Sequence, residues 1–301
     1  MLVLSQQLQG LLAGLLAYGM WGLFPLFFHL LRDVPSTEVL LHRIIWSFIF
    51  VCLIIIGLGW KSRFVQVFHN RALLRGLFIS SFLVSFNWLV YIWTVAQGRV
   101  LEASLGYFLT PLVSVFLARV FLREALDSAR WTAILLAAAG IFWLIINLGI
   151  FPWISLSLAL SFGLYGLMRK QLEVDPITGL GVETILLLPL ALSYALYLGW
   201  MGTANFINAG SYVSLLLMAC GVITAVPLLF FATATKKLSL SAVGFMMYIN
   251  PSLQFVVAIY ILDEAFNRDL LVGFVFIWVA LVVFTAGSIR AELQHKHESA
   301  G

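Results

Sequence analysis

Long apolar runs alternate with short polar connections along almost the whole chain. A helix needs about 20 mostly apolar residues to cross a bilayer, and ten runs of roughly this length can be placed in the sequence. Turn-forming and charged residues gather in the connections between these runs. The pattern therefore predicts an all-α membrane protein with ten transmembrane helices. The helices are expected at residues 8–31, 37–57, 73–96, 100–122, 131–148, 152–169, 178–199, 212–235, 239–262 and 270–290.

The composition supports this prediction. Of the 301 residues, 62% are hydrophobic and only 10% are charged, whereas soluble domains carry about 25% charged residues. The formal net charge of +4 does not indicate a nucleic-acid partner, because almost all lysines and arginines fall between the apolar runs. Cys52 and Cys220 lie inside such runs and are expected to be small buried side chains rather than a disulfide or a metal site. Residues 1–10 contain no basic residue and precede a run too long for a cleavable signal, so the first helix is expected to be retained.

The basic residues are divided unevenly between the two sides of the predicted bundle. Segments on the side of the N-terminus hold thirteen lysines and arginines, and connections on the other side hold Arg32, Arg99 and Arg268. Basic residues are enriched in the cytoplasmic loops of membrane proteins. Both termini are therefore expected in the cytoplasm.

Two stretches of the chain resemble each other, at residues 101–125 and 240–265. Each has a small residue, a glycine, an aromatic residue and a proline in an apolar run, and the offset is 140 from Pro111 and Pro251 onward. The stretches fall in helices four and nine, an odd number of helices apart, so the two halves must lie in opposite orientations. Inverted repeats with broken helices near the midplane are a recurring plan of secondary transporters. The predicted parts are a first five-helix repeat at 1–148, a second at 149–290 and a polar cytoplasmic tail at 291–301.

Pro111 and Pro251 lie about halfway along their predicted helices. Each removes a backbone N–H and clashes with the carbonyl four residues earlier, at Tyr107 and Met247. In a bilayer the freed groups need another partner or a wet cavity. We interpret the pair as two kinks that line a central cavity; the alternative is that each proline is a structural kink and nothing more.

Charged residues inside the predicted helices are the second candidate feature. An ionised side chain at the bilayer centre costs roughly 2.5–3.5 kcal/mol on insertion scales, so it is expected to face the interior of the bundle. His42 and Arg43 lie nearly two turns into helix two, and Glu183 lies at the corresponding place in helix seven. Aligning the prolines at 35 and 176 matches His42 with Glu183, whereas the offset of 140 matches Arg43 with Glu183.

These charges have more than one interpretation. Arg43 is a candidate for holding an anionic solute, although arginine also extends readily to the headgroups. Glu183 is interpreted as either a coupling group or a structural hydrogen-bond partner. Glu102, near the outer end of helix four, is either a partner for Arg43 or an acid that favours a helix N-terminus.

A stripe of polar residues follows the third predicted helix. Ser80, Asn87, Tyr91 and Thr94 are spaced seven, four and three residues apart, which places them on one helical face. Such a face in a bilayer marks either a solute path or hydrogen bonds between helices. Other candidates flank this stripe or lie beside the two prolines. The predicted substrate-binding set is Arg43, His42, Asn87, Trp88, Tyr91, Trp93, Tyr107, Tyr248, Asn250 and Gln254.

Enzyme signatures are absent from the sequence. It contains no His-Glu-x-x-His, no Gly-x-Ser-x-Gly, no phosphate-binding glycine loop and no paired intramembrane aspartates. The histidines are scattered, at positions 29, 42, 69, 295 and 297. We therefore expect no catalytic residues, no metal site, no cofactor and no step driven by ATP.

Several short motifs follow one another along the chain: Glu38-Val-Leu-Leu-His-Arg-Ile-Ile-Trp-Ser47, Asn87-Trp-Leu-Val-Tyr-Ile-Trp93, Leu101-Glu-Ala-Ser-Leu-Gly-Tyr-Phe108, Tyr165-Gly-Leu-Met-Arg-Lys170 and Glu183-Thr-Ile-Leu-Leu-Leu-Pro189. In this order they resemble the motifs of one transporter family, the RarD branch of the EamA transporters, also called chloramphenicol-sensitive proteins, in the drug/metabolite transporter superfamily. The resemblance runs from about residue 8 to 290. It implies two inverted five-helix halves, permease activity and a place in the bacterial inner membrane.

The chain departs from the family pattern beside the paired prolines. Thr110 stands before Pro111 where the family usually has asparagine, Met247 stands where it usually has glutamine, and Asn250 stands where it often has a small residue. These positions are therefore expected to affect substrate preference within the family.

The sequence predicts a secondary transporter that moves a small metabolite or drug-like solute by alternating access. Arg43 would attract an anionic group, aromatic residues would form the walls of the cavity, and Glu183 would couple transport to protons or hold a structural hydrogen bond. Export fits the resemblance to the superfamily, and the sequence itself does not indicate the direction of transport. The alternative is a channel or a lipid scramblase, although no charge ring or carbonyl filter indicates one. The expected partners are the solute and the lipid bilayer, with no nucleic acid, and nothing in the sequence indicates an oligomeric state.

Overall fold

A computed structural model describes residues 6–123, 126–149, 151–238 and 246–298 of the chain. The described residues form helices joined by short connections, and no strand occurs among them. The helices are α1 (Gln6–Gly22), α2 (Phe24–His29), α3 (Ser36–Gly57), α4 (Lys61–His69), α5 (Arg71–Ala96), α6 (Val100–Leu122), α7 (Ser128–Leu148), α8 (Trp153–Gln171), α9 (Pro176–Trp200), α10 (Asn205–Asn208), α11 (Ser211–Lys237), α13 (Ile249–Tyr260) and α14 (Arg268–Glu298).

Most of these helices are long and apolar enough to cross a bilayer. Eight described segments meet that condition, and α1 and α2 together form the first of them. The helices α8 and α13 are not among the eight, because α8 is interrupted by serines and basic residues and α13 has 12 residues. Both coincide with helices that the sequence predicts. The described residues therefore confirm an all-α membrane protein and leave the ten-helix count as a prediction.

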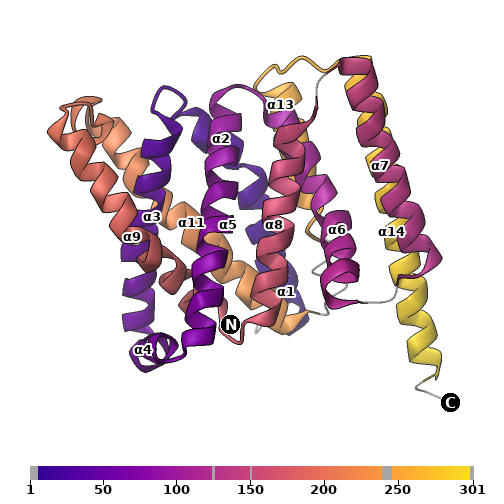
Figure 1. The fold of residues 1–301 in the computed structure, drawn as a ribbon, viewed down its shortest axis with the longest axis horizontal. Helices are drawn as coiled ribbons and strands as arrows, with labels where there is room; N and C mark the ends of the chain where they lie inside the picture. The colour runs from indigo at the N-terminus through magenta and orange to yellow at the C-terminus, as the bar shows by residue number, and fades with distance from the viewer. Residues whose placement is uncertain (1–5, 124–125, 150, 239–245, 299–301) are drawn as a thin grey trace.

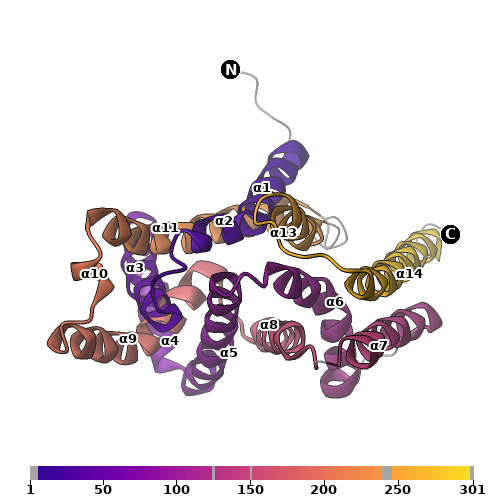
Figure 2. The same ribbon diagram turned by 90° about the horizontal axis from the view of Figure 1, so that it is seen from above.

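The connections alternate between the two ends of the bundle. In Figure 1, α4 and the end of α14 lie at the lower end, and the α2–α3 and α13–α14 connections lie at the upper end. Figure 2 shows α7 and α14 side by side at one edge, with α9 and α10 at the opposite edge. The basic connection that includes α4 thus lies at the same end as the end of α14.

Neighbouring helices occur in matched pairs. If the described helical segments are counted in order, with α1–α2 first and with α4 and α10 left out, the most extensive contacts have a counterpart five segments on. The α1–α11 contact is matched by α5–α8, α3–α11 by α5–α9, and α1–α13 by α6–α8. The contacts α3–α9, α6–α13 and α7–α14 each join two equivalent segments.

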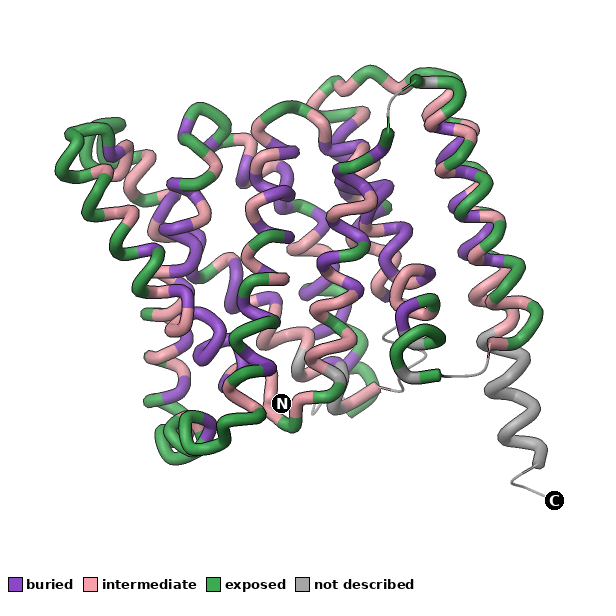
Figure 3. The backbone as a smooth tube through the Cα atoms, in the orientation of Figure 1, coloured by how far each residue is buried: buried purple, intermediate pink, exposed green. Residues whose placement is uncertain are grey.

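Buried residues concentrate in the centre of the bundle, and exposed ones face outward, as Figure 3 shows. The largest buried cluster joins residues from α2, α5, α6, α8, α11 and α14, including Phe28, Leu105, Leu158 and Phe274. The outer surface is also apolar, with Leu196 74% exposed. Such an outer surface suits contact with lipid, since lipid tails are as apolar as leucine.

Two of the predicted helices are interrupted. A turn at Leu23 separates α1 from α2 two residues before Pro25, and turn residues Met247 and Tyr248 precede α13. The predicted helix at 239–262 is therefore wrong as a continuous segment, since its break falls at the carbonyl that Pro251 would clash with. By contrast, α6 continues through Pro111 as one helix. The paired prolines thus have different outcomes in the two halves.

Two short helices within connections, α4 and α10, are additional to the helices that the sequence predicts. The helix α14 extends to Glu298, so residues 291–298 of the predicted polar tail are helical. The repeat at 101–125 ends in residues 124 and 125, and the other begins within 239–245, both outside the described residues.

Candidate functional site

Arg43 lies in the second turn of α3 and is 4% exposed. Its guanidinium carbon is 4.1 Å from the ring centroid of Trp88, 5.5 Å from that of Phe28 and 5.8 Å from that of Phe24. A cation over an aromatic face is attracted by the negative charge density of the ring. The structure therefore places Arg43 inside the bundle, within an aromatic enclosure formed by α2 and α5, and not at the headgroups.

The guanidinium of Arg43 has no acidic partner among the described residues. Its Nε and Nη1 atoms are buried and have no hydrogen-bond partner within the described part of the chain. The ion pairs found among the described residues do not include Arg43. Aromatic faces attract the positive charge but are poor hydrogen-bond acceptors for the N–H groups of the guanidinium. The planar arrangement of these N–H groups matches the oxygens of a carboxylate or phosphate. The geometry thus leaves two buried donors that suit an anionic ligand.

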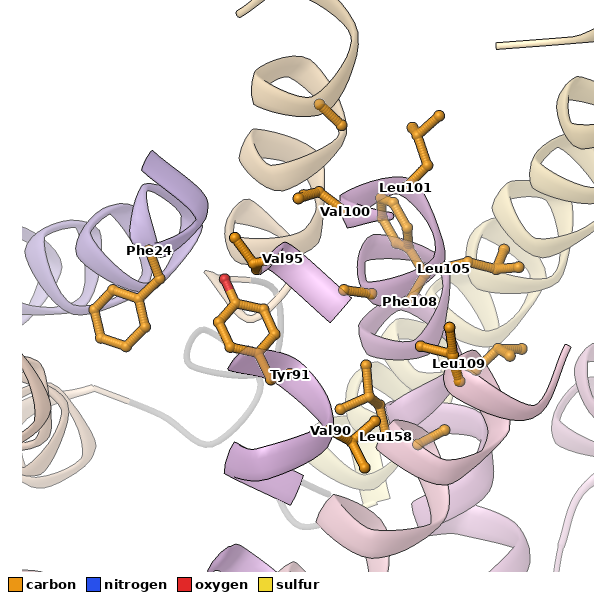
Figure 4. Packing of buried hydrophobic residues seen from close by; sticks show 14 of the residues in the cluster. Phe24, Val90, Tyr91, Val95, Val100, Leu101, Leu105, Phe108, Leu109 and Leu158 are labelled. Atoms are coloured by element: carbon orange, nitrogen blue, oxygen red, sulfur yellow. The ribbon is translucent and has the colours of Figure 1, made fainter. Parts of the chain in front are cut away.

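Tyr91, Tyr107 and Cys220 lie close enough to Arg43 to interact with its charge. The Tyr91 ring contacts Phe28 and Tyr107 at centroid distances of 5.8 Å each. Its hydroxyl is buried and has no hydrogen-bond partner among the described residues. Figure 4 shows Tyr91 projecting from α5 between Phe24 of α2 and the residues of α6. The hydroxyl of Tyr91 is therefore a third polar atom near Arg43 without a partner among the described residues.

The predicted polar stripe of α5 lies on one buried face. Ser80, Asn87, Tyr91 and Thr94 are each 3% exposed or less. The Asn87 amide donates to the carbonyl of Leu158 at 3.1 Å and to the Ser161 hydroxyl at 2.9 Å. Its amide oxygen accepts from the Tyr107 hydroxyl at 3.3 Å. The middle of the stripe therefore joins α5 to α8 and α6, which is the hydrogen-bonding alternative that the sequence left open.

Glu183 occupies the other end of the stripe. It is 1% exposed, and its carboxylate accepts from the Ser80 hydroxyl at 2.6 Å and the Tyr165 hydroxyl at 3.3 Å. The Nη1 atom of Arg169 lies 3.5 Å from Oε1 of Glu183. Three helices, α5, α8 and α9, therefore meet at one buried carboxylate. The sequence did not indicate Arg169 as the partner, because a basic residue at the end of a predicted helix was interpreted as a determinant of topology.

Arg43 and Glu183 have equivalent neighbours. Ser80 of α5 contacts Glu183, and Cys220 of α11 lies near Arg43. Residues 80 and 220 are 140 apart, as are residues 43 and 183. This offset is the one between Pro111 and Pro251, so the contacts favour matching Arg43, rather than His42, with Glu183. Within the described ranges, Arg43 is thus a cation without an ionic partner, and Glu183 at the equivalent position is an anion with several polar partners.

Other predicted residues have separate partners. His42 stacks on Phe206 at 4.7 Å and accepts from the Trp46 indole at 3.2 Å. Trp93 contacts Trp153 at 5.4 Å. Glu102 is in the first turn of α6 and pairs with Arg99 at 2.6 Å, so of the two alternatives for Glu102 the described contacts favour an acid at the helix N-terminus over a partner for Arg43.

The candidates of the second repeat form a polar group at the start of α13. The Gln254 amide donates to the Asn250 side chain at 2.8 Å, and the Ser104 hydroxyl donates to the carbonyl of Pro251 at 2.9 Å. Tyr248 is hydrogen-bonded to Thr285. The Gln254 carbonyl oxygen is buried and has no partner within the described ranges. No described contact joins this group to Arg43.

Glu38 and Glu264 are buried or half-buried acids that sequence reasoning did not select. Glu38 is 1% exposed and accepts from the Asn205 amide at 2.7 Å and from the backbone N–H of Phe206 at 3.1 Å. Glu264 accepts from the backbone N–H groups of Val100 at 2.5 Å and Leu101 at 2.8 Å. Each joins elements of different halves. In the part of the chain that the structure describes, no group of three or more histidines, cysteines or acids could hold a metal ion.

Comparison with known proteins gives consistent matches. The model of the EamA-like transporter family matches residues 8–146. An "Uncharacterized transporter" of Vibrio cholerae serotype O1 is 40% identical over 284 residues, covering 94% of both chains. The "Protein RarD" of Escherichia coli strain K12 is 41% identical over 288 residues, covering 96% of this chain and 97% of that protein.

The fold is also similar to that of a protein whose crystal structure has been solved. The TM-score is 0.58 at 16% sequence identity, and the match covers 95% of this chain and 98% of the other. At this identity the match concerns the fold alone. It extends over both halves of the chain, beyond the residues that the family model matches.

Proposed function

The chain belongs to the RarD branch of the EamA transporters, in the drug/metabolite transporter superfamily, and on this premise we propose that it carries a small anionic solute by alternating access. Its long apolar helices make it a multi-pass membrane protein. The proposed location is the bacterial inner membrane, with both termini in the cytoplasm. The uneven division of lysines and arginines supports this orientation.

The observation that carries the proposal is the state of Arg43. A buried charge without a partner is costly, and proteins keep intramembrane charges mainly where they function. Two buried N–H donors of Arg43 lack acceptors among the described residues, and aromatic rings surround the rest of the group. A carboxylate or phosphate group of a solute would supply the missing acceptors, and the rings would contact its apolar part. Export is the proposed direction.

Glu183 supports the alternating-access part of the proposal. It occupies the position equivalent to Arg43 in the second half and ties α5, α8 and α9 together. Equivalent elements in two inverted halves can exchange roles when a transporter opens to one side and then to the other. The matched helix neighbours support such an exchange. Proton coupling through Glu183 is the proposed energy source, and Ser80, Tyr165 and Arg169 would hold its ionised form.

Thermal unfolding of the purified protein in detergent tests the anion site. The probes are small carboxylates, each matched with its neutral amide of the same shape, such as benzoate with benzamide. A ligand at one hundred times its Kd stabilises the folded protein by about 2.7 kcal/mol. We expect benzoate or another carboxylate of the panel to raise the unfolding temperature, and its amide to leave it unchanged.

Arg43→Ala should abolish the carboxylate effect, because it removes the charge and both buried donors. The control is Arg63→Ala, since Arg63 is exposed on α4 and contacts the Trp60 ring. Uptake of radiolabelled carboxylate into proteoliposomes should follow the same order. An Arg43→Ala protein that still distinguishes the carboxylate from its amide would refute the proposal.

A further inference from the structure

The connection between α9 and α11 touches the first turns of α3 through its middle, where residues 204–206 are buried or half-buried and the rest of the connection is exposed. It contains α10, and its contacts with α3 come from Asn205 and Phe206. Gly202 and Gly210 flank it with φ angles of +69° and +89°. Glycine adopts such angles without the steric cost that other residues have, so both ends of the segment are tight turns with little side-chain packing.

Glu38 holds this connection through both carboxylate oxygens. Oε2 accepts from the Asn205 amide at 2.7 Å, and Oε1 accepts from the backbone N–H of Phe206 at 3.1 Å. Glu38 is 1% exposed, so these bonds form largely away from solvent, where a bond to a charged group is strong. No other element of the described chain donates a hydrogen bond to this carboxylate. Among the described residues, the side chain of Glu38 therefore accepts hydrogen bonds only from this connection.

Phe206 is half-buried where the connection meets α3 and α11. Its ring stacks on His42 at 4.7 Å and lies 6.2 Å from Trp46. It packs against the main hydrophobic cluster, to which Leu217 and Cys220 of α11 belong. Deeper in the bundle, α3 and α11 are in close contact, because a Cβ on Gly221 would lie 2.4 Å from the carbonyl oxygen of Trp46.

The contact between α3 and α11 beside Phe206 adjoins the Arg43 site. His42, on which Phe206 stacks, precedes Arg43 in α3, and Cys220 lies close enough to Arg43 to interact with its charge. An apolar ring between two helices excludes water from the polar site beneath it. The segment can leave without unfolding a long helix, because α10 has four residues.

We propose that Phe206 is a movable outer gate over the Arg43 site and that Glu38 is the positioning residue that holds the gate closed. The proposal rests on the alternating-access function proposed above. In the closed state Glu38 holds the backbone of the connection and Phe206 covers the contact between α3 and α11. In the open state the connection pivots at Gly202 and Gly210, so that Phe206 leaves α3 and the residues beneath it are open to the outer side.

Reactivity of Cys220 provides the test. The chain has two cysteines, so Cys52→Ser leaves Cys220 as the single thiol. The protein in nanodiscs is treated with a negatively charged methanethiosulfonate reagent, and the modified fraction is followed by mass spectrometry. In the Glu38→Ala variant we expect modification about tenfold faster than in the parent, since the bonds that close the gate are lost. Phe206→Ala should have a similar effect, and Glu38→Gln a smaller one, because its amide oxygen still accepts from the backbone of Phe206.

The matched control is Glu264→Ala. Glu264 also holds backbone N–H groups across the two halves, but at the start of α6. It should leave Cys220 reactivity as in the parent. Equal rates in Glu38→Ala and the parent, or an equal increase in both glutamate variants, would overturn the proposal, since the latter means general loosening.

A second variant covers the case in which Glu38→Ala does not fold. Asn205→Ala removes one donor to the carboxylate and leaves Glu38 in place, so it should raise the reaction rate by a smaller factor. Hydrogen exchange at the Phe206 amide should rise in parallel. An unchanged rate in Asn205→Ala together with unchanged exchange at Phe206 would also refute the gate. Carboxylate selectivity at Arg43 is measured without a thiol reagent, so the gate and the anion site can each fail alone.

Discussion

The backbone of Gly179 lies directly against the guanidinium of Arg169. A Cβ at position 179 would be 2.0 Å from Nη1 and 2.4 Å from Nη2, closer than any real contact. Gly179 and Glu183 are one turn apart on α9, so the glycine provides the space through which Arg169 of α8 reaches the buried carboxylate. The absence of a side chain at one position thus makes an ion pair possible at another.

Gly179→Ala should therefore destabilise the protein through Glu183. Arg169 is flexible enough to move away from the new methyl group, but it then leaves the carboxylate with Ser80 and Tyr165 alone. Removing one partner of a buried pair typically costs roughly 3–5 kcal/mol, and part of that loss is expected here. The measurement is the midpoint of thermal unfolding in detergent.

Two controls separate this effect from a change in helix propensity. Gly199→Ala is on the same helix and has no atom within 4 Å of the added Cβ, so its midpoint should not fall. In a Glu183→Gln background Gly179→Ala should cost much less, because the charge that needs Arg169 is gone. If Gly179→Ala lowers the unfolding midpoint equally in both backgrounds, the loss of stability does not come from the contact between Arg169 and Glu183.

The two tyrosines near Arg43 should respond in opposite directions to loss of the hydroxyl. The Tyr91 hydroxyl is buried without a partner among the described residues, so Tyr91→Phe should raise stability by about 1 kcal/mol. The Tyr107 hydroxyl donates to Asn87, so Tyr107→Phe leaves an amide oxygen unpaired and should lower stability by about 1 kcal/mol. Thermal unfolding without added carboxylate gives both values.

The same pair tests the anion site from another direction. If the Tyr91 hydroxyl is a spare donor for the solute, Tyr91→Phe should also reduce the stabilisation by the carboxylate probe. If Tyr91→Phe is less stable than the parent without the probe, the Tyr91 hydroxyl already has a hydrogen-bond partner. It would then not be a spare donor for the solute.

The sequence predicted the polar stripe of α5 and the interior position of the charges because both follow from local rules. Spacings of seven, four and three residues place side chains on one helical face whatever the neighbouring helices are. A charged side chain that faces lipid costs free energy, so it is expected inside the bundle. The partner of each charge depends on which helices pack together. Arg169 and Glu38 each lie near a helix end, where a charge is ordinary, and neither position shows that the side chain is buried against a distant segment.

The prolines show why local rules give the position of a break but not whether it forms. Pro111 and Pro251 remove the same N–H and oppose the same relative carbonyl, yet α6 continues and a turn precedes α13. The difference lies in the surroundings. Near Pro251, Ser104 donates to its carbonyl and Gly22 lies against Leu253, so the start of α13 is held from outside its own helix.

Gly22→Ala should therefore disturb the junction of α1, α2 and α13. The added Cβ would lie 2.6 Å from Cβ of Leu253 and 3.2 Å from the carbonyl oxygen of Asn250. Overpacking of this kind typically costs about 1–3 kcal/mol. Gly19→Ala is the control, because nothing lies within 4 Å of its Cβ. Equal unfolding midpoints for the two variants would show that the junction accommodates the added methyl group without loss of stability.

Glu264 should make stability depend on pH. It lies between α13 and α14, outside the spanning helices, and burial raises the pKa of its carboxyl above the ordinary value, although the backbone N–H groups of Leu101 and Val100 act in the opposite direction. Because the pKa is higher in the folded protein, the folded state binds the proton first as pH falls.

Protonation of Glu264 therefore stabilises the folded protein. This stabilisation is complete below the unfolded-state pKa and is lost as pH rises through the folded-state pKa. Wild type should gain stability relative to Glu264→Gln as pH falls from about 7 to about 5, since the amide does not titrate. Unfolding midpoints of both proteins across this range measure the difference, and a difference that instead favours wild type more as pH rises would mean that the two backbone N–H groups outweigh burial.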